Sequence, residues 1–179
     1  MAIEYTLSLG SKISEIQNLL IKETSHINTE VGWHKNFRNQ DVLNINCHDQ
    51  GFHIAVIGSL GVAIYQNIKF KIATSITFRF TKEYHDVVLQ KKNLLTLILR
   101  ILSQIKQDVI FDFNGDCLLL YRKDEKLFVN TYFGFWNDEN MDLLEEEYNE
   151  IYEKEEIAKE IKSLGIKKLS YTKVPYLGA

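Results

Sequence analysis

Apolar and polar side chains alternate in several short stretches of the chain, and this alternation predicts strands. In residues 3–9, "IEYTLSL", every second side chain is apolar, as in a strand with one buried face. The stretch "TSITFRFTK" (74–82) shows the same pattern. Weaker patterns in "DVLNINCHD" (41–49) and "FHIAVIG" (52–58) also favour strands, whereas "SLGVAIYQNIKFK" (59–71) suits either a helical turn or a strand.

Three further stretches carry apolar side chains at helical spacing. Residues 12–26 predict an amphipathic helix, with Ser11 placed to cap its first turn. Residues 83–106 carry so wide an apolar surface that we expect this helix to lie across a sheet and to form the centre of the core. A third helix, rich in acidic side chains, is expected over residues 138–163, before Gly165.

An Asn-Gly pair at residues 114–115 stands between two apolar stretches and predicts a hairpin. Both positions tolerate the positive φ that a tight type I′ turn requires. We expect this turn to set Phe113 opposite Asp116, Phe111 opposite Leu118 and Val109 opposite Leu120. A third strand is expected after "KDEK" (123–126).

The same turn could be mistaken for a calcium loop, because Asp112, Asn114 and Asp116 alternate as calcium ligands do. A calcium loop needs a glycine at its sixth position and a glutamate at its twelfth. This chain has Cys117 and Lys123 there. We therefore interpret the stretch as a turn between strands and expect no metal.

The order of these elements predicts one α+β domain over residues 1–179. We expect a mostly antiparallel sheet packed by the long apolar helix, an N-terminal β-α unit and the acidic helix as the C-terminal element. The chain has 179 residues, 45% hydrophobic and 25% charged, which is typical of a globular protein of this size.

The overall charge of −3 is unevenly distributed. Residues 138–160 contain eleven acidic residues and two lysines, whereas the rest of the chain contains 13 acidic and 19 basic residues. The acidic side chains repel one another, and a basic partner would relieve that repulsion and be attracted from a distance. A solvent-exposed, soluble helix is the simpler interpretation of the same pattern.

Aromatic side chains in "YFGFWND" (132–138) directly precede the acidic helix. Aromatic anchors next to charged residues are typical of protein interfaces. The residues that we expect to contact a partner are Trp136, Glu145, Glu146, Glu150 and Glu153.

Catalytic or metal-binding chemistry has a weaker basis in the sequence. Cys47, His48 and His53 could line a pocket, with Asp49 as a further ligand, but the stretch lacks a fourth zinc ligand at finger-like spacing. No nucleophile elbow, zinc-protease motif or phosphate loop is present. We expect no enzyme activity and no cofactor; the alternative is a small-molecule-binding or enzymatic α+β domain that uses these three residues.

Other partners and locations are not favoured by the sequence. Basic side chains are scattered and do not form a stripe interleaved with aromatic residues, so nucleic-acid binding is not expected. The longest apolar stretch, residues 93–105, is too short to span a bilayer and contains Arg100. With no signal peptide at the start and only two distant cysteines, a cytoplasmic location is expected.

Three stretches together resemble a known family: "MAIEYTLSL", "TSITFRFTK" followed by a long apolar helix, and "DVIFDFNGDCLLLYRKDEKLFVN". In this order they are similar to bacterial immunity proteins of the swarming-inhibition (Sit) type, which are cognate to contact-delivered polymorphic toxins. The resemblance covers the first nine residues and approximately residues 74–133. Residues 28–73 and the acidic C-terminal region depart from it.

The resemblance implies a small cytoplasmic protein that binds and neutralises one cognate toxin by protein–protein contact, without catalysis. The matching stretches are core and turn residues, so the resemblance assigns no functional residue. The acidic helix leads us to expect a toxin of basic character. The sequence does not indicate whether the chain is a monomer or an oligomer.

Overall fold

A computed structural model of the chain describes residues 3–58, 62–65, 68–115, 117–124, 126–130, 135–147 and 151–152. These residues form an α+β domain with three α-helices and a nine-stranded sheet, which is built of eight antiparallel strands and one parallel edge strand. A separate two-stranded hairpin accompanies the sheet. The α+β fold with a mostly antiparallel sheet is confirmed.

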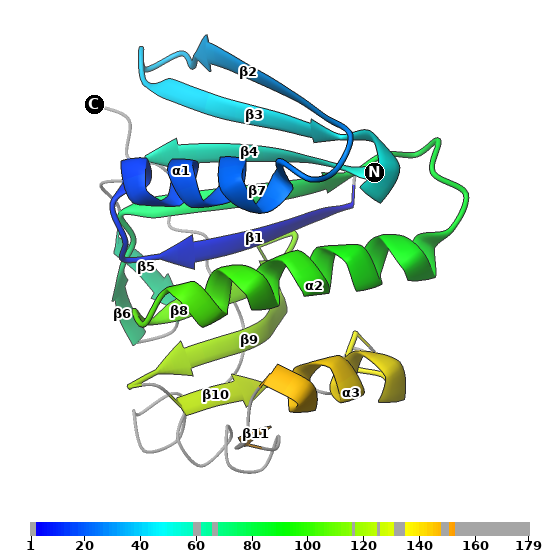
Figure 1. Cartoon of the computed structure of the whole chain (residues 1–179). Helices are drawn as coiled ribbons and strands as arrows, with labels where there is room; N and C mark the ends of the chain where they lie inside the picture. Colours follow the sequence, from blue (N-terminus) through cyan, green and yellow to red (C-terminus); the bar gives the residue numbers. More distant parts are fainter. Residues whose placement is uncertain are drawn as a thin grey trace.

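Along the chain the elements are β1 (Glu4–Leu9), α1 (Ile13–Thr24), β2 (Thr29–Lys35), β3 (Asp41–Cys47), a short 3-10 helix (His48–Gln50), β4 (Phe52–Gly58), β5 (Val62–Tyr65), β6 (Ile68–Lys71), β7 (Thr74–Phe80), α2 (Val87–Gln104), β8 (Val109–Phe113), β9 (Cys117–Lys123), β10 (Lys126–Val129), α3 (Asp138–Glu147) and β11 (Ile151–Tyr152). The strand order in the large sheet is β11-β10-β9-β8-β1-β7-β4-β3-β2. Figure 1 shows α1 and α2 on the same side of this sheet.

Strand β1 lies in the middle of the sheet and pairs antiparallel with both β7 and β8. Its alternate side chains Tyr5, Leu7 and Leu9 are buried in the core, as the sequence pattern predicts. Leu7 lies opposite Ile76 of β7 and Phe111 of β8. Because directly opposite residues point to the same face of a sheet, this row forms the floor on which the helices pack.

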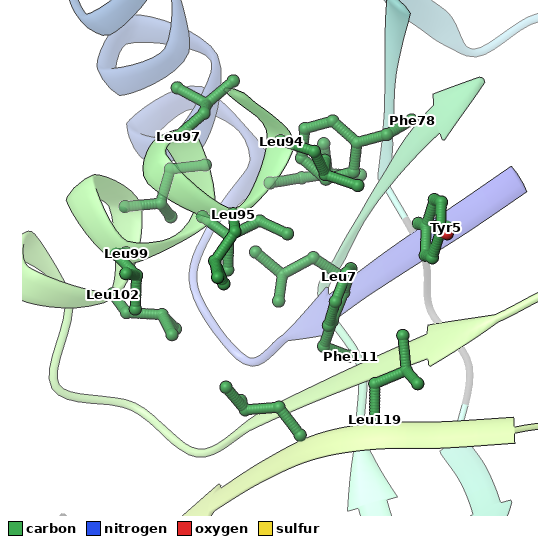
Figure 2. Packing of buried hydrophobic residues seen from close by; sticks show 14 of the residues in the cluster. Tyr5, Leu7, Phe78, Leu94, Leu95, Leu97, Leu99, Leu102, Phe111 and Leu119 are labelled. Atoms are coloured by element: carbon green, nitrogen blue, oxygen red, sulfur yellow. The ribbon is translucent and has the colours of Figure 1, made fainter. Parts of the chain in front are cut away.

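Helix α2 supplies much of the other side of the core, as its wide apolar surface predicts. Figure 2 shows Leu94 and Leu95 on the side of α2 that faces Phe78 and Leu7. Each fully buried leucine or isoleucine contributes about 1.5–3 kcal/mol of stability. The buried apolar residues of α2 are Leu94, Leu95, Leu97, Ile98, Leu99, Ile101 and Leu102.

The start of α2 is fixed by two polar side chains. Asp86 is its N-cap and accepts a hydrogen bond from the backbone N–H of Leu89 at 2.9 Å, which satisfies one of the unpaired donors of the first turn. The buried side-chain amide of Gln90 donates to the carbonyl oxygens of Gly51 at 2.7 Å and Thr81 at 3.0 Å. The helix therefore begins at Val87, four residues later than predicted.

The predicted hairpin is present, but its predicted register is wrong. Phe113 pairs with Cys117 and Phe111 with Leu120, and the register shifts between Phe111 and Asp112. The shift is a bulge that leaves Leu119 as the extra residue between Leu118 and Leu120. Leu119 and Leu120 are both buried in the core, so the bulge turns two successive side chains inwards.

The turn itself has the conformation expected of an Asn-Gly pair, with φ of 52° at Asn114 and 73° at Gly115. The Asp112 carboxylate accepts a hydrogen bond from the Gly115 backbone N–H at 2.8 Å. Asn114 also joins the turn to β1, since its N–H donates to the Glu4 carbonyl oxygen at 2.8 Å. Among the described residues, Asp112 and Asn114 therefore serve the turn between two strands.

One alternative that the sequence left open is decided, and one further expectation needs correction. The ambiguous residues 59–71 contain the antiparallel strands β5 and β6. The acidic helix was expected over residues 138–163, but α3 ends at Glu147, and Ile151–Tyr152 pairs parallel with β10. Tyr152 lies opposite Phe128, so sheet pairing replaces the helix there. The rest of the expected helix, residues 153–163, lies outside the described residues.

Candidate functional site

The tryptophan expected to anchor a partner lies in the core. Trp136 is only 6% exposed. Its indole N–H donates to the Leu119 carbonyl oxygen at 2.8 Å, and its ring makes an edge-to-face contact with Phe135 at 5.0 Å. A buried indole N–H needs such an acceptor. In this structure Trp136 fixes the segment before α3 onto β9, and its contact with a partner stays a prediction.

Helix α3 presents acidic side chains at its start. Asp138, Glu139 and Asp142 are exposed, whereas Leu144 is completely buried. Two of the acids, Asp138 and Glu139, lie in the first turn, where the helix dipole stabilises negative charge. The helix therefore docks through Leu144 and keeps Asp138, Glu139 and Asp142 exposed on its outer side.

The remaining acidic residues expected to contact a partner are only partly covered by the structure. Glu145 and Glu146 lie in the last turn of α3. Glu150 and Glu153 lie outside the described residues. The prediction that these four glutamates bind a partner is neither confirmed nor contradicted.

The alternative pocket of Cys47, His48 and His53 is not formed. Cys47 is fully buried in the core, and burial raises the pKa of its thiol to about 12. It pairs with Phe52 across β3 and β4, so the next residue, His53, points to the opposite face of the sheet. His48 lies in the 3-10 helix near Asn46. The Cys47 thiol stays protonated and faces away from His53, so the two side chains cannot act together as a nucleophile and its base.

Within the ranges given above, no group of three or more histidine, cysteine, aspartate or glutamate side chains is placed to hold a metal ion. In the same part of the chain, no helix combines the length and apolar character needed to cross a membrane.

The face of the sheet opposite α1 and α2 carries a polar groove that the sequence analysis missed. This shallow, open groove has a volume of about 560 Å³. The ion pair between Arg79 and Glu4, 2.9 Å apart, crosses from β7 to β1 beside it. The alternation of polar with buried residues in β3, β4 and β7 was the signal for this face. Its lining residues are Glu30, Gly32, Asn44, Ile45, Asn46, His53, Ile54, Ala55, Thr77 and Arg79.

A second surface missed by the sequence analysis is the edge strand β2. Six of its seven residues are exposed, and the structure shows it at the margin of the sheet (Figure 1). Trp33 is 54% exposed and Val31 is 45% exposed. Phe37, just after the strand, is 92% exposed. Exposed apolar side chains on a sheet edge are typical of interaction sites.

These surfaces, together with the core, lie largely within a region that matches one protein family. Residues 3–140 match the SitI3-like family. The chain belongs to the SitI3-like family. No curated protein and no solved structure gave a significant match.

The SitI3-like match covers more of the chain than the resemblance seen in the sequence. It includes residues 28–73, which were expected to depart from the family, so that expectation is wrong. The match ends within the first turn of α3. The polar groove and β2 are therefore part of the family fold, while Asp142 and the glutamates after it lie beyond the matched region.

Proposed function

We propose that this protein is a cytoplasmic immunity protein, which binds one cognate bacterial toxin and neutralises it by protein–protein contact without catalysis. The observation that carries the proposal is the match to the SitI3-like family over residues 3–140. Immunity is the role that this family suggests. The toxin would belong to a polymorphic toxin system, as the resemblance to Sit-type immunity proteins implies.

The arrangement of the described side chains supports contact rather than chemistry. The alternative enzymatic site depends on Cys47 acting with His53, and these side chains lie on opposite faces of the sheet. Cys47 is also protonated at physiological pH, since burial raises its pKa to about 12. The structure offers instead two open polar surfaces, the groove on the sheet and the acidic side of α3.

We assign the toxin contact to the acidic side of α3 and the residues that follow it. The exposed acids Asp138, Glu139 and Asp142 would form this surface with Glu145, Glu146, Glu150 and Glu153. A basic toxin domain would be attracted to it at long range, which raises the association rate more than the final affinity. The family match ends at residue 140, so Asp138 and Glu139 lie within it and the other five acids lie beyond it.

The proposal is tested by producing the protein in bacteria together with the toxin domain encoded at the same locus. Growth should be rescued, and a catalytically inactive form of the toxin should purify with the protein as a stoichiometric complex. Failure to rescue growth, with both proteins present in soluble form, would contradict the proposal. Rescue without any complex would show that the protein acts by some means other than contact.

A further inference from the structure

Strand β2 ends the large sheet and exposes apolar side chains in a regular pattern. Val31 and Trp33 lie opposite Ile45 and Leu43 of β3, both of which are fully buried. Since opposite residues share a face, Val31 and Trp33 lie on the same face of the sheet as the helices. They are exposed because the helices do not cover this end of that face. Helix α1 contacts β3 and β4, and its exposed Ile21 adds to the apolar surface on that side of the sheet.

Hydrogen bonds at the two ends of β2 show which of its backbone N–H and C=O groups bond to β3 and which point away from β3. The N–H of Asn36 donates to the carbonyl oxygen of Gln40 at 3.0 Å, and the N–H of His48 donates to the carbonyl oxygen of Asn28 at 3.2 Å. Residues in an antiparallel pair alternate between bonding to the partner strand and pointing away from it. The even-numbered residues of β2 therefore bond to β3. The odd-numbered residues from Thr29 to Lys35 direct their N–H and C=O groups away from β3, to an edge where the described part of the chain has no further strand.

We propose that β2 pairs antiparallel with β2 of a second copy of this chain, with the two-fold axis at Gly32, so that two sheets join into one. In this register Val31 faces Trp33 of the second copy and Thr29 faces Lys35. These are the residues whose backbone groups point outwards, so each such pair exchanges two hydrogen bonds. All seven residues of β2 face a residue of the second copy, and the four odd-numbered ones make the hydrogen bonds to it.

The side chains of β2 are complementary to themselves in this register. Glu30 faces His34 of the second copy, and Val31 faces Trp33, each twice because the interface is two-fold symmetric. Moving the register by two residues keeps the backbone pattern but sets Glu30 opposite Gly32 or Asn36, and the acid–imidazole contacts are lost. Aromatic–aliphatic pairs such as Val31 and Trp33 stabilise facing strands, and a carboxylate can accept a hydrogen bond from an imidazole N–H. This self-complementarity favours a second copy over an unrelated strand as the occupant.

Gly32 allows a direct test by disulfide formation. On the axis it faces itself in a pair that makes no hydrogen bonds, where the two Cα atoms are about 4.5 Å apart; disulfides need about 4.4–6.8 Å. A side chain added at Gly32 meets no atom within 4 Å in the structure, so Gly32→Cys leaves the fold intact. The native Cys47 and Cys117 are both buried and do not compete.

We expect purified Gly32→Cys protein to form a disulfide-linked dimer under mild oxidation. The control Lys35→Cys lies on the same strand, but in the proposed register it is about 20 Å from its own copy, so it should remain largely unlinked. Equal crosslinking of the two variants, or none in Gly32→Cys, would overturn the proposed register.

A second measurement asks whether the unmodified chain dimerises in solution. Sedimentation velocity over a wide concentration range should show a monomer–dimer equilibrium. Val31→Pro removes an N–H that points away from β3, and proline is tolerated at such an edge position. The variant should weaken the dimer about tenfold or more. Its unfolding transition should remain cooperative, as expected of a protein that still folds. The control Phe37→Ser removes an exposed apolar side chain outside β2 and should leave the equilibrium unchanged. A protein that stays monomeric at all concentrations, or a Val31→Pro variant that dimerises normally, would overturn the proposal; neither result bears on toxin binding by α3.

Discussion

The indole N–H of Trp136 donates to the carbonyl oxygen of Leu119, 2.8 Å away, and this hydrogen bond joins the segment before α3 to the bulged strand β9. Leu119 is the extra residue of the bulge, and its own side chain is 1% exposed. Asn140 extends the attachment by donating its side-chain amide to the carbonyl oxygen of Phe135. The position of the acidic helix therefore depends on buried contacts of the residues before it.

Replacing Trp136 should first reduce stability. Trp136→Phe keeps a ring in the core but removes one of two hydrogen bonds to the Leu119 carbonyl, which still accepts from the Asn130 N–H at 2.9 Å. The lost bond should lower the free energy of unfolding by about 0.5–1.5 kcal/mol. The same substitution at the exposed Trp33 should change it by less than about 0.5 kcal/mol. Urea unfolding of both variants measures the difference. A direct partner contact by Trp136 predicts the opposite outcome: unchanged stability and a weaker complex with the toxin.

The hydrogen bonds of Gln90 should be nearly as important for stability. Gln90→Leu removes the 2.7 and 3.0 Å hydrogen bonds to the carbonyl oxygens of Gly51 and Thr81, which keep only their backbone donors. The loss of two bonds should lower the free energy of unfolding by about 1–3 kcal/mol. The control is Gln104→Leu, the same change at an exposed position of α2. It should lower the free energy of unfolding by less than about 0.5 kcal/mol. Equal effects in thermal or urea unfolding would show that the buried amide contributes nothing specific.

The turn that Gln90 holds cannot accept a larger residue at Gly51. This glycine has a φ of +77°, and an added Cβ would lie 2.5 Å from the Tyr84 ring and 2.8 Å from Gln90. Both the backbone conformation and the lack of space disfavour other residues. The structure thus explains why a glycine separates the 3-10 helix from β4.

Stability should fall at alkaline pH. Burial raises the pKa of the Cys47 thiol from 9.0 to about 12, and burial together with the nearby Cys117 raises that of the Tyr5 hydroxyl from 10.0 to about 12. The folded state therefore holds these protons more tightly than the unfolded state. This contribution is complete below the ordinary pKa values and is lost as the pH rises from about 9 towards 12.

Urea unfolding at about pH 8 and about pH 10.5 should show this loss. Cys47→Ala removes one of the two groups, and its free energy of unfolding should depend less steeply on pH over the same range. A stability that is constant or rises between the two pH values would contradict the inferred burial of both groups. A slope that is unchanged in Cys47→Ala would contradict the part assigned to Cys47.

Reversing charges on α3 should slow association with the toxin. Glu139→Lys, and separately the double variant Glu145→Lys/Glu146→Lys, should lower the association rate and reduce its dependence on salt, with smaller changes in dissociation. Glu15→Lys is a matched control for Glu139, because both are acidic residues in the first turn of a helix. Stopped-flow or surface-binding kinetics would measure the rates. Loss of binding in Glu15→Lys alone would move the toxin site to α1.

The sequence predicted those parts of the fold in which one face is buried and the other is not. In β1 and β7, apolar side chains occupy every second position. A period of two places all of them on one face of the strand, and that face must turn towards the core. Strand β2 was missed because six of its seven residues are exposed, so no alternation marks it. The end of α3 was misplaced because the sequence pattern does not reveal that Ile151–Tyr152 pairs with β10.

The register of the hairpin and the burial of Trp136 could not be predicted for a different reason. The Asn-Gly pair predicted the turn, but the bulge at Leu119 depends on which side chains the core accepts, and local spacing cannot show that. Trp136 was expected at the surface because it adjoins a run of acids. Its burial depends on the carbonyl group of Leu119, 17 residues earlier in the chain. Such contacts between distant segments are not encoded in any short pattern.

We propose that this SitI3-like protein neutralises its toxin by forming a complex and not by turnover. The most direct test is to titrate purified protein into a fixed amount of active toxin and to measure the remaining toxin activity. Neutralisation by contact predicts that activity falls linearly and reaches its minimum at one protein chain per toxin molecule. Complete neutralisation by far less than one equivalent, increasing with incubation time, would contradict the claim and show that the protein is a catalyst.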